Sequence, residues 1–174
     1  VDKSQELSIV TVAGPDGRTV LPAFTSVDSM RVWNPKARPV PATAGRVALA
    51  AANESTDLVV IDPTSDTEFV LRRPAVWALA QSLPWTPSFL DPEVLQAFMD
   101  AAAPEPSVRG VYLAPGDPTA RLVGPELVVQ LALEDSLDRP TLDAVLERLR
   151  ERWTRSELIA QRVDSLRVQL VNVR

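Results

Sequence analysis

The sequence predicts an α+β protein, with an N-terminal sheet of two hairpins and short helices followed by a smaller β-β-α-β C-terminal subdomain. Short β-branched runs bounded by turn residues predict the strands, and apolar residues at helical spacing behind capping residues predict the helices. The 16 prolines fall between these segments rather than within them. With 45% hydrophobic residues, the 174-residue chain can bury one large core or two small ones.

The first predicted hairpin joins strands over residues 7–12 and 19–24 through a turn at 14–17. Proline in that turn fixes φ, and the glycines permit a positive φ. Ser26 is a good N-cap for a short helix over 27–33, in which Val, Met and Trp follow at helical spacing.

A second helix is predicted over 43–53, capped by its initial threonine. The continuous apolar run 58–62 is typical of a buried strand, and residues 67–71 return from a tight turn to complete a second hairpin. Residues 74–83 follow as a helix with proline in its first turn.

Prolines are concentrated in residues 84–92, which we interpret as the domain boundary. The expected organisation is an N-terminal α+β domain over 1–83, a proline-rich linker with one helix over 84–106, and a C-terminal subdomain over 107–174. Asp91 is the expected N-cap of the linker helix.

The C-terminal subdomain is predicted to begin with strands at 108–113 and 126–133. Asp138 and Pro140 then open the clearest amphipathic helix of the chain. Residues 166–173 are apolar and β-branched and are expected to form a closing strand.

Composition excludes several kinds of chemistry. The chain has no histidine and no cysteine, so a Ser-His-Asp triad, a thiolate nucleophile and a zinc site with its usual ligands are excluded. No glycine-rich nucleotide-binding motif is present, and we expect no cofactor. A Ser-Lys pair would depend on Lys3 or Lys36, and neither stands in a segment expected to be desolvated.

The net charge of −5 argues against nucleic acid and anionic membranes as partners. The densest group of arginines, over 148–155, is interleaved with glutamates that cancel most of its field. No apolar run is long enough to span a bilayer, and the start of the chain is not a signal peptide. We therefore expect a soluble, cytoplasmic protein.

Carboxylates are the remaining candidates for acid–base catalysis or metal binding. They form three clusters: Asp57/Asp62/Asp66, Glu134/Asp135/Asp138 and Glu147/Glu151. We interpret the first as turn chemistry, because Asp62 and Asp66 bracket a hairpin turn. The second is interpreted as a helix cap with its solvated loop, and the third as the exposed face of a helix.

Aromatic side chains are few, and we expect Trp77, Phe98 and Trp153 to pack in the core. Trp85 and Phe89 lie in the proline-rich segment. They either staple the two halves of the chain together or form an exposed interaction patch, and the sequence leaves both alternatives open.

Two stretches carry a resemblance to a known family. The run Leu21-Pro22-Ala23-Phe24-Thr25-Ser26, with Trp33 seven residues on, resembles the SseB family, named for enhanced serine sensitivity. Residues 59–63 and 69–71 resemble the later part of the same N-terminal domain, so the resemblance covers about residues 7–83. The Ala-, Val-, Pro- and Arg-rich composition is typical of a GC-rich genome and indicates an actinobacterial member.

The resemblance implies an α+β N-terminal domain, a bacterial cytoplasmic origin and no established molecular activity. It also implies that helical sequence preceding residue 1 is missing. The motif itself has a structural interpretation, in which Phe24 ends a strand toward the core and Ser26 caps a helix. The sharper alternative is that Thr25 and Ser26, at a helix N-terminus, bind a small anion or an amino-acid carboxylate.

Three functional hypotheses follow. The leading one is a non-catalytic binding or regulatory module that engages another protein, or a second copy of itself, through an apolar or edge-strand surface. The candidate binding residues are Phe24, Thr25, Ser26, Trp33, Trp85 and Phe89. The second hypothesis is a small-molecule sensor with its site at Thr25 and Ser26, and the third is an enzyme that uses carboxylates alone.

Overall fold

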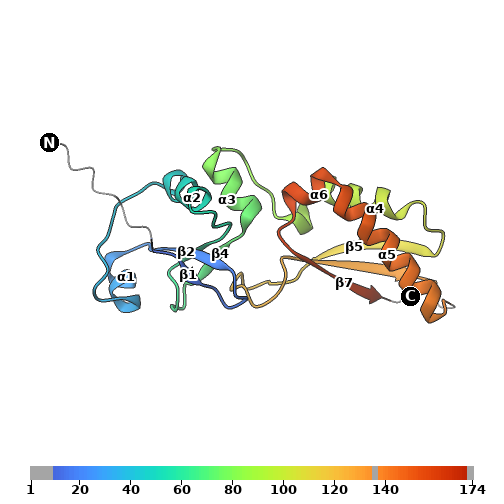
Figure 1. The fold of residues 1–174 in the computed structure, drawn as a ribbon, viewed down its shortest axis with the longest axis horizontal. Coiled ribbons are helices and arrows are strands. Elements are labelled where there is room, and N and C mark those ends of the chain that lie inside the picture. The colour runs from blue at the N-terminus through green and yellow to red at the C-terminus, as the bar shows by residue number, and fades with distance from the viewer. Residues whose placement is uncertain (1–9, 135–136, 172–174) are drawn as a thin grey trace. The chain divides into compact units, whose positions relative to one another are not determined.

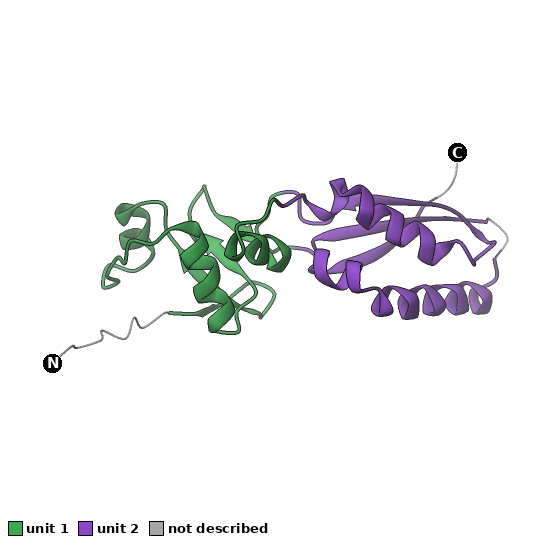
Figure 2. Ribbon diagram, turned by 90° about the horizontal axis from the view of Figure 1, so that it is seen from above, with its two compact units in different colours: residues 1–84, 119–123 green, residues 85–118, 124–174 purple. Residues whose placement is uncertain are grey.

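The computed structural model describes residues 10–134 and 137–171, which fall into two compact units (Figures 1 and 2). Unit 1 is the chain up to Pro84 together with Thr119–Val123, and unit 2 is Trp85–Pro118 with the chain from Gly124 onward. Each unit contains its own sheet and its own helices, which confirms the predicted α+β class.

The sheet of unit 1 has the order β1-β2-β3-β4. Its strands are β1 (Val12–Ala13), β2 (Thr19–Ala23), β3 (Val59–Ile61) and β4 (Phe69–Leu71). Both predicted hairpins are present as antiparallel pairs, and a parallel pairing of β2 with β3 joins them into one sheet. Residues 7–9 of the first predicted strand lie outside the described residues.

Three helices complete unit 1: α1 (Val27–Trp33), α2 (Ala44–Asn53) and α3 (Arg73–Ala80). The predicted caps of the first two are correct, because the side chains of Ser26 and Thr43 each accept a hydrogen bond from the backbone N–H three residues on. Helices α2 and α3 lie on the same side of the sheet (Figure 1).

Unit 1 has a small core on each face of its sheet. One core joins the sheet to α2 and α3 and contains Leu21, Ala48, Ala51, Val59 and Val76. The other contains Val20, Leu58, Val60, Val70 and Leu122. Leu122 belongs to the 119–123 segment, which the chain supplies much later, and in the same segment Ala120 O accepts a 2.7 Å hydrogen bond from Val70 N. This segment therefore covers the outer edge of β4.

Unit 2 consists of one sheet with its helices on a single face (Figure 1). Its elements are the short 3-10 helix η1 (Ser88–Leu90), α4 (Pro92–Ala102), β5 (Val108–Pro115), β6 (Leu127–Leu133), α5 (Arg139–Arg155), α6 (Glu157–Arg162) and β7 (Leu166–Val171). The strand order is β5-β6-β7, with β5 antiparallel and β7 parallel to the central β6.

The segment expected to be a linker supplies a core helix. Val94 and Phe98 of α4 are fully buried in the core of unit 2, and Phe89 packs against that core. The prolines of this segment allow the helix because Pro92 occupies its first turn, where no intrahelical N–H donor is required. Asp91 caps α4 as predicted, by accepting from the N–H groups of Glu93 and Val94.

Core packing was predicted for three aromatic residues, and the prediction is correct for Phe98 and Trp153. Phe98 and Trp153 pack edge to face in the core of unit 2, with ring centroids 5.3 Å apart. Trp77 is 38% exposed, and the prediction of a core position is wrong. The buried face of α3 is formed instead by its small residues, and the guanidinium of Arg73 lies over the Trp77 ring.

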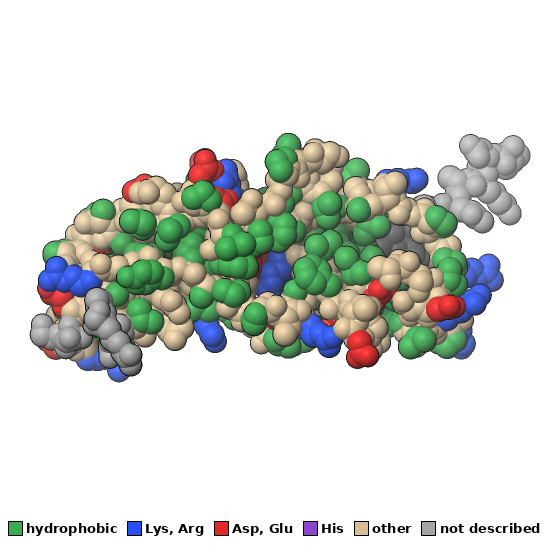
Figure 3. Space-filling model, turned by 180° about the vertical axis from the view of Figure 1, so that it is seen from behind, with side chains coloured by type: hydrophobic (Ala, Val, Ile, Leu, Met, Phe, Trp, Pro, Cys, Tyr) green, Lys and Arg blue, Asp and Glu red, His purple; other side chains and the backbone are tan. Residues whose placement is uncertain are grey.

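Charged side chains are dispersed over the face that Figure 3 shows. In Figure 3, basic and acidic side chains lie singly or in small groups, with hydrophobic side chains between them. No helix in the described part of the chain is long and apolar enough to cross a membrane. The described residues also contain no cluster of three or more acidic side chains that could hold a metal ion.

An ion pair network around the buried carboxylate of Glu105 joins the loop after α4 to α5. Glu105 is 4% exposed, and its carboxylate accepts from Arg148 at 2.9 and 2.6 Å and lies 2.8 Å from Arg152. Hydrogen bonds from Arg148 outweigh the effect of burial and, with those from Arg152, lower the pKa of Glu105 to about 2. The carboxylate therefore remains charged in the folded protein under conditions in which the unfolded chain would be protonated.

Stability should depend on this carboxylate in acid. Because folding lowers the pKa of Glu105, its contribution is complete above about pH 4.5 and is lost as the pH falls toward 2. Glu105→Gln should lower the free energy of unfolding by about 2 kcal/mol at pH 7. It should also reduce the fall of this free energy between pH 4.5 and 2, as measured by denaturant unfolding between pH 2 and 7. Glu151→Gln, at an exposed ion pair, is the control and should leave the profile unchanged. Equal profiles for both variants would refute the network's role.

Candidate functional site

The family motif lies where β2 and β3 end side by side. Because these strands are parallel and Ala23 pairs with Ile61, the residues that follow them meet at one edge of the sheet. Asp62, only 2% exposed, directs its carboxylate to Thr25, 37 residues earlier in the chain. The N–H of Thr25 donates to Oδ1 at 2.8 Å, and the Thr25 hydroxyl donates to Oδ2.

The Asp62 carboxylate is held in its charged form. Burial alone would raise the pKa of Asp62, but hydrogen bonds from Thr25, Ser29 and Thr67 together outweigh it and place the pKa below its usual value. The backbone of Asp62 has a φ of 46°, a region that aspartate tolerates better than most residues. The predicted role of this residue is turn chemistry, and its side chain does accept a hydrogen bond from the Thr67 hydroxyl across its own turn, at 3.4 Å. Its shorter hydrogen bonds come from Thr25, in the loop that follows the neighbouring strand.

The predicted binding residues of unit 1 are occupied by contacts within the fold. Both donors of Thr25 bond to Asp62, and the Ser26 hydroxyl caps α1 by accepting from Ser29 N at 3.0 Å. The rings of Phe24 and Trp33 pack against each other with centroids 5.3 Å apart. An anion at Thr25 would have to replace the Asp62 carboxylate, so no observation here favours the sensor hypothesis.

The other predicted binding residues belong to unit 2. Trp85 is 44% exposed, whereas Phe89 is partly buried against the core. The sequence left open whether the pair forms a staple or a surface patch, and the structure gives the two residues different environments. They therefore do not form one surface with the Thr25 region within either unit.

Most acidic clusters also have structural partners. Asp138 caps α5 by accepting from Thr141 N, while Glu134 pairs with Arg109. Asp135 lies outside the described residues. On α5, Glu147 pairs with Arg150 and Glu151 with Arg155. The contacts of Asp138, Glu147 and Glu151 are local, as the sequence interpretation expected, whereas the pair of Glu134 with Arg109 joins residues 25 apart in the chain.

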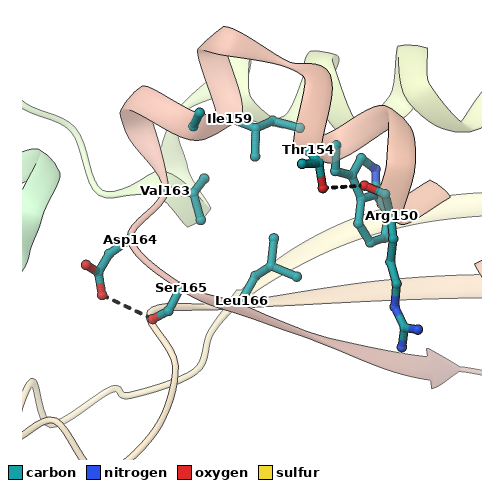
Figure 4. Close-up of a pocket in the computed structure, with 9 residues that line it drawn as sticks. Arg150, Thr154, Ile159, Val163, Asp164, Ser165 and Leu166 are labelled. Atoms are coloured by element: carbon teal, nitrogen blue, oxygen red, sulfur yellow. Dashed lines mark hydrogen bonds between the residues drawn. The ribbon is translucent and has the colours of Figure 1, made fainter. Parts of the chain in front are cut away.

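An apolar groove lies on the helix side of unit 2 beside β7 (Figure 4). It has a volume of about 370 Å³. The residues that line it are Arg150, Trp153, Thr154, Ile159, Ala160, Val163, Asp164, Ser165 and Leu166. The labelled side chains of Ile159 and Val163 point from α6 and its end toward Leu166 at the start of β7. We call this the β7 groove.

Strand β7 forms the edge of its sheet next to this groove. The N–H of Leu127 donates to the carbonyl oxygen of Ser165 at 3.0 Å. This bond shows which residues of β7 direct their N–H and C=O groups to β6 and which direct them away from it. Residues 165, 167, 169 and 171 therefore direct their backbone groups to β6, and Leu166, Val168 and Leu170 direct theirs outward. No strand in the described chain pairs with these outward groups. We call the outward N–H and C=O groups of Leu166, Val168 and Leu170 the β7 edge.

The sequence pattern predicts this strand but not its position at the edge of a sheet. The run 166–173 gave its β-branched pattern, whereas its parallel pairing with β6 is set by the α5–α6 crossover. The side chain of Leu170 is 48% exposed, although β7 is hydrogen-bonded to the central strand β6. The near-continuous alternation of apolar residues in 166–170 was the only sequence signal.

The fold and the motif geometry define unit 1 as an α+β domain built on a mixed sheet whose two halves meet at a buried aspartate. Residues 1–78 match the family model of the SseB protein N-terminal domain, so this part of the chain is an SseB N-terminal domain. The predicted resemblance is confirmed. No curated protein and no solved structure matches the chain.

Asp62→Asn should test whether the motif is structural. Asparagine tolerates the positive φ, so the variant removes the charge without adding backbone strain. We expect unfolding free energy to fall by about 1–2 kcal/mol, because charge-assisted hydrogen bonds from Thr25 are weakened. Asp57→Asn, at an exposed position in the same region, should change little. Unchanged stability in Asp62→Asn would show that the bonds to Thr25 contribute nothing.

Thermal unfolding with added serine, other amino acids and metabolite anions should show no shift in Tm attributable to the motif, since the Thr25 donors already bond to Asp62. A ligand-dependent rise in Tm that Ser26→Ala abolishes would restore the sensor hypothesis. Ser82→Ala, at an exposed turn in unit 1, is the matched control.

Proposed function

We propose that this chain is a non-catalytic protein-interaction module that binds an extended protein segment along the β7 edge. The observation that carries the proposal is the six-residue strand β7, in which every second residue, at 166, 168 and 170, directs its backbone N–H and C=O outward. An apolar groove lies beside this strand. An added strand would satisfy the outward backbone groups, and its side chains could enter the groove.

The other sheet edges are poorly suited to strand addition. In unit 1, β1 has two residues, and β4 has three and is covered by the 119–123 segment. In unit 2, the register of β5 is irregular between Val108 and Gly110, and the strand ends at Pro115. Short strands, irregularities and prolines are the features that prevent edges from pairing. Within the described chain, β7 is the edge that has none of them.

The β7 groove adds a place for apolar side chains. Trp153, Ile159 and Val163 line it and belong to the core of unit 2, so core packing holds this part of its wall in place. The indole N–H of Trp153 is buried and has no hydrogen-bond partner among the described residues. A rigid apolar groove beside free backbone groups supports recognition of an extended segment by its side chains as well as by its backbone.

The proposal assigns structural roles to three acidic residues that each accept hydrogen bonds within the fold. The carboxyl groups of Asp62, Glu105 and Asp138 have lowered pKa values, each because hydrogen-bond donors favour the charged form. A carboxyl group that acts as a general acid near neutral pH requires the opposite shift. These acids therefore stabilise the fold in a form unsuited to proton donation.

Selection of random 12-residue peptides on the intact chain should yield binders that require the β7 edge. Leu170→Pro removes one outward N–H without breaking the ladder to β6, and it should weaken such peptides at least about tenfold by fluorescence anisotropy. Val123→Ser, which changes an exposed apolar residue of unit 1, is the matched control and should bind normally. Peptides that bind Leu170→Pro as well as the parent chain would contradict the proposed site.

A further inference from the structure

The shape of the β7 edge indicates a particular partner. Its outward positions, Leu166, Val168 and Leu170, are evenly spaced about Val168. If a second β7 runs antiparallel to the first with Val168 opposite Val168, each outward N–H faces an outward C=O of the other strand. Three residue pairs would then exchange six backbone hydrogen bonds, with no outward group of these residues left over.

We propose that two copies of this chain pair through their β7 edges about a twofold axis at Val168, forming one six-stranded sheet. This inference rests on the proposed function, because it names the segment that occupies the β7 edge. A twofold interface requires a surface that is complementary to itself. The side chains of β7 meet that requirement.

On the helix side of the sheet, the pairing matches apolar side chains. Leu166 would face Leu170 of the second copy, and Val168 would face its own equivalent. Leu166 lines the β7 groove, while Leu170 is 48% exposed at the other end of the same strand. Each copy therefore offers an exposed leucine to the groove of the other, and the two contacts are equivalent by symmetry.

On the opposite side of the sheet, the pairing avoids like charges. Arg167 is the one charged residue within β7, and in this register it would face Gln169 of the second copy rather than another arginine. The glutamine of each copy can accept a hydrogen bond from the guanidinium opposite. Like charges directly opposed would have destabilised the pair, so the sequence of β7 is compatible with itself on both faces.

Single cysteines provide a direct test, because these 174 residues contain none. Val168→Cys should form disulfide-linked dimers under mild oxidation, since opposed residues in an antiparallel pair lie within disulfide range. An equal mixture of Arg167→Cys and Gln169→Cys should give the mixed dimer in several-fold excess over either variant alone. Tyr112→Cys, 54% exposed on β5, reports random collision. Efficient self-linking of Gln169→Cys instead would overturn the proposed register.

Sedimentation equilibrium of the cysteine-free chain separates the two proposals. We expect concentration-dependent dimerisation that Val168→Pro weakens by about tenfold or more, whereas Val168→Thr, which keeps the N–H and the β-branched shape, dimerises normally. A monomer at all concentrations that still binds β7-dependent peptides would overturn the dimer and leave the proposed function intact. A monomer with no β7-dependent peptide would overturn both.

Discussion

The hydrogen-bonding requirement of backbone groups at the sheet edges is the constraint on which this structure depends. Each small sheet ends in strands whose outer N–H and C=O groups lack a ladder partner, and such groups are costly unless water or another chain segment satisfies them. In unit 1 the chain meets this requirement internally, since the 119–123 segment returns to cover β4. In unit 2 it leaves β7 regular and apolar, which is the basis for the functional proposal.

The family motif has a structural explanation in this fold. Parallel pairing of β2 and β3 brings Thr25 to Asp62, and the buried carboxylate accepts both donors of Thr25. The same loop then begins α1, whose cap is Ser26. The motif thus fixes how the two hairpins of unit 1 join, which accounts for its residue types without a ligand. The candidate interaction surface accordingly lies away from the motif, in unit 2.

Local signals in the sequence predicted the elements well, whereas contacts between distant segments could not be predicted. Ser26, Thr43, Asp91 and Asp138 were identified as caps because capping depends on three or four adjacent residues. Trp77 was placed in the core because helical spacing does not show which face small residues will bury. Helix α4 packs in the core of unit 2, whereas the prolines around it predict a linker.

The candidate site was missed for the same reason. An edge strand and a central strand have similar compositions when one face packs on helices, and only the strand order distinguishes them. The sequence did favour an apolar or edge-strand surface as a class of site, but it placed the candidate residues at the motif and in the proline-rich segment. The register of β7 on β6, which sets the direction of its free backbone groups, emerges only from the fold.

Amide hydrogen exchange, followed residue by residue at low and high protein concentration, tests the central claim most directly. The amides of Arg167 and Gln169 point to β6 and should be protected at every concentration, while those of Val168 and Leu170 should become protected only as concentration rises. This alternating pattern is what occupation of the β7 edge predicts. Amides of Val168 and Leu170 that exchange rapidly at all concentrations, and also with a selected peptide bound, would contradict the account.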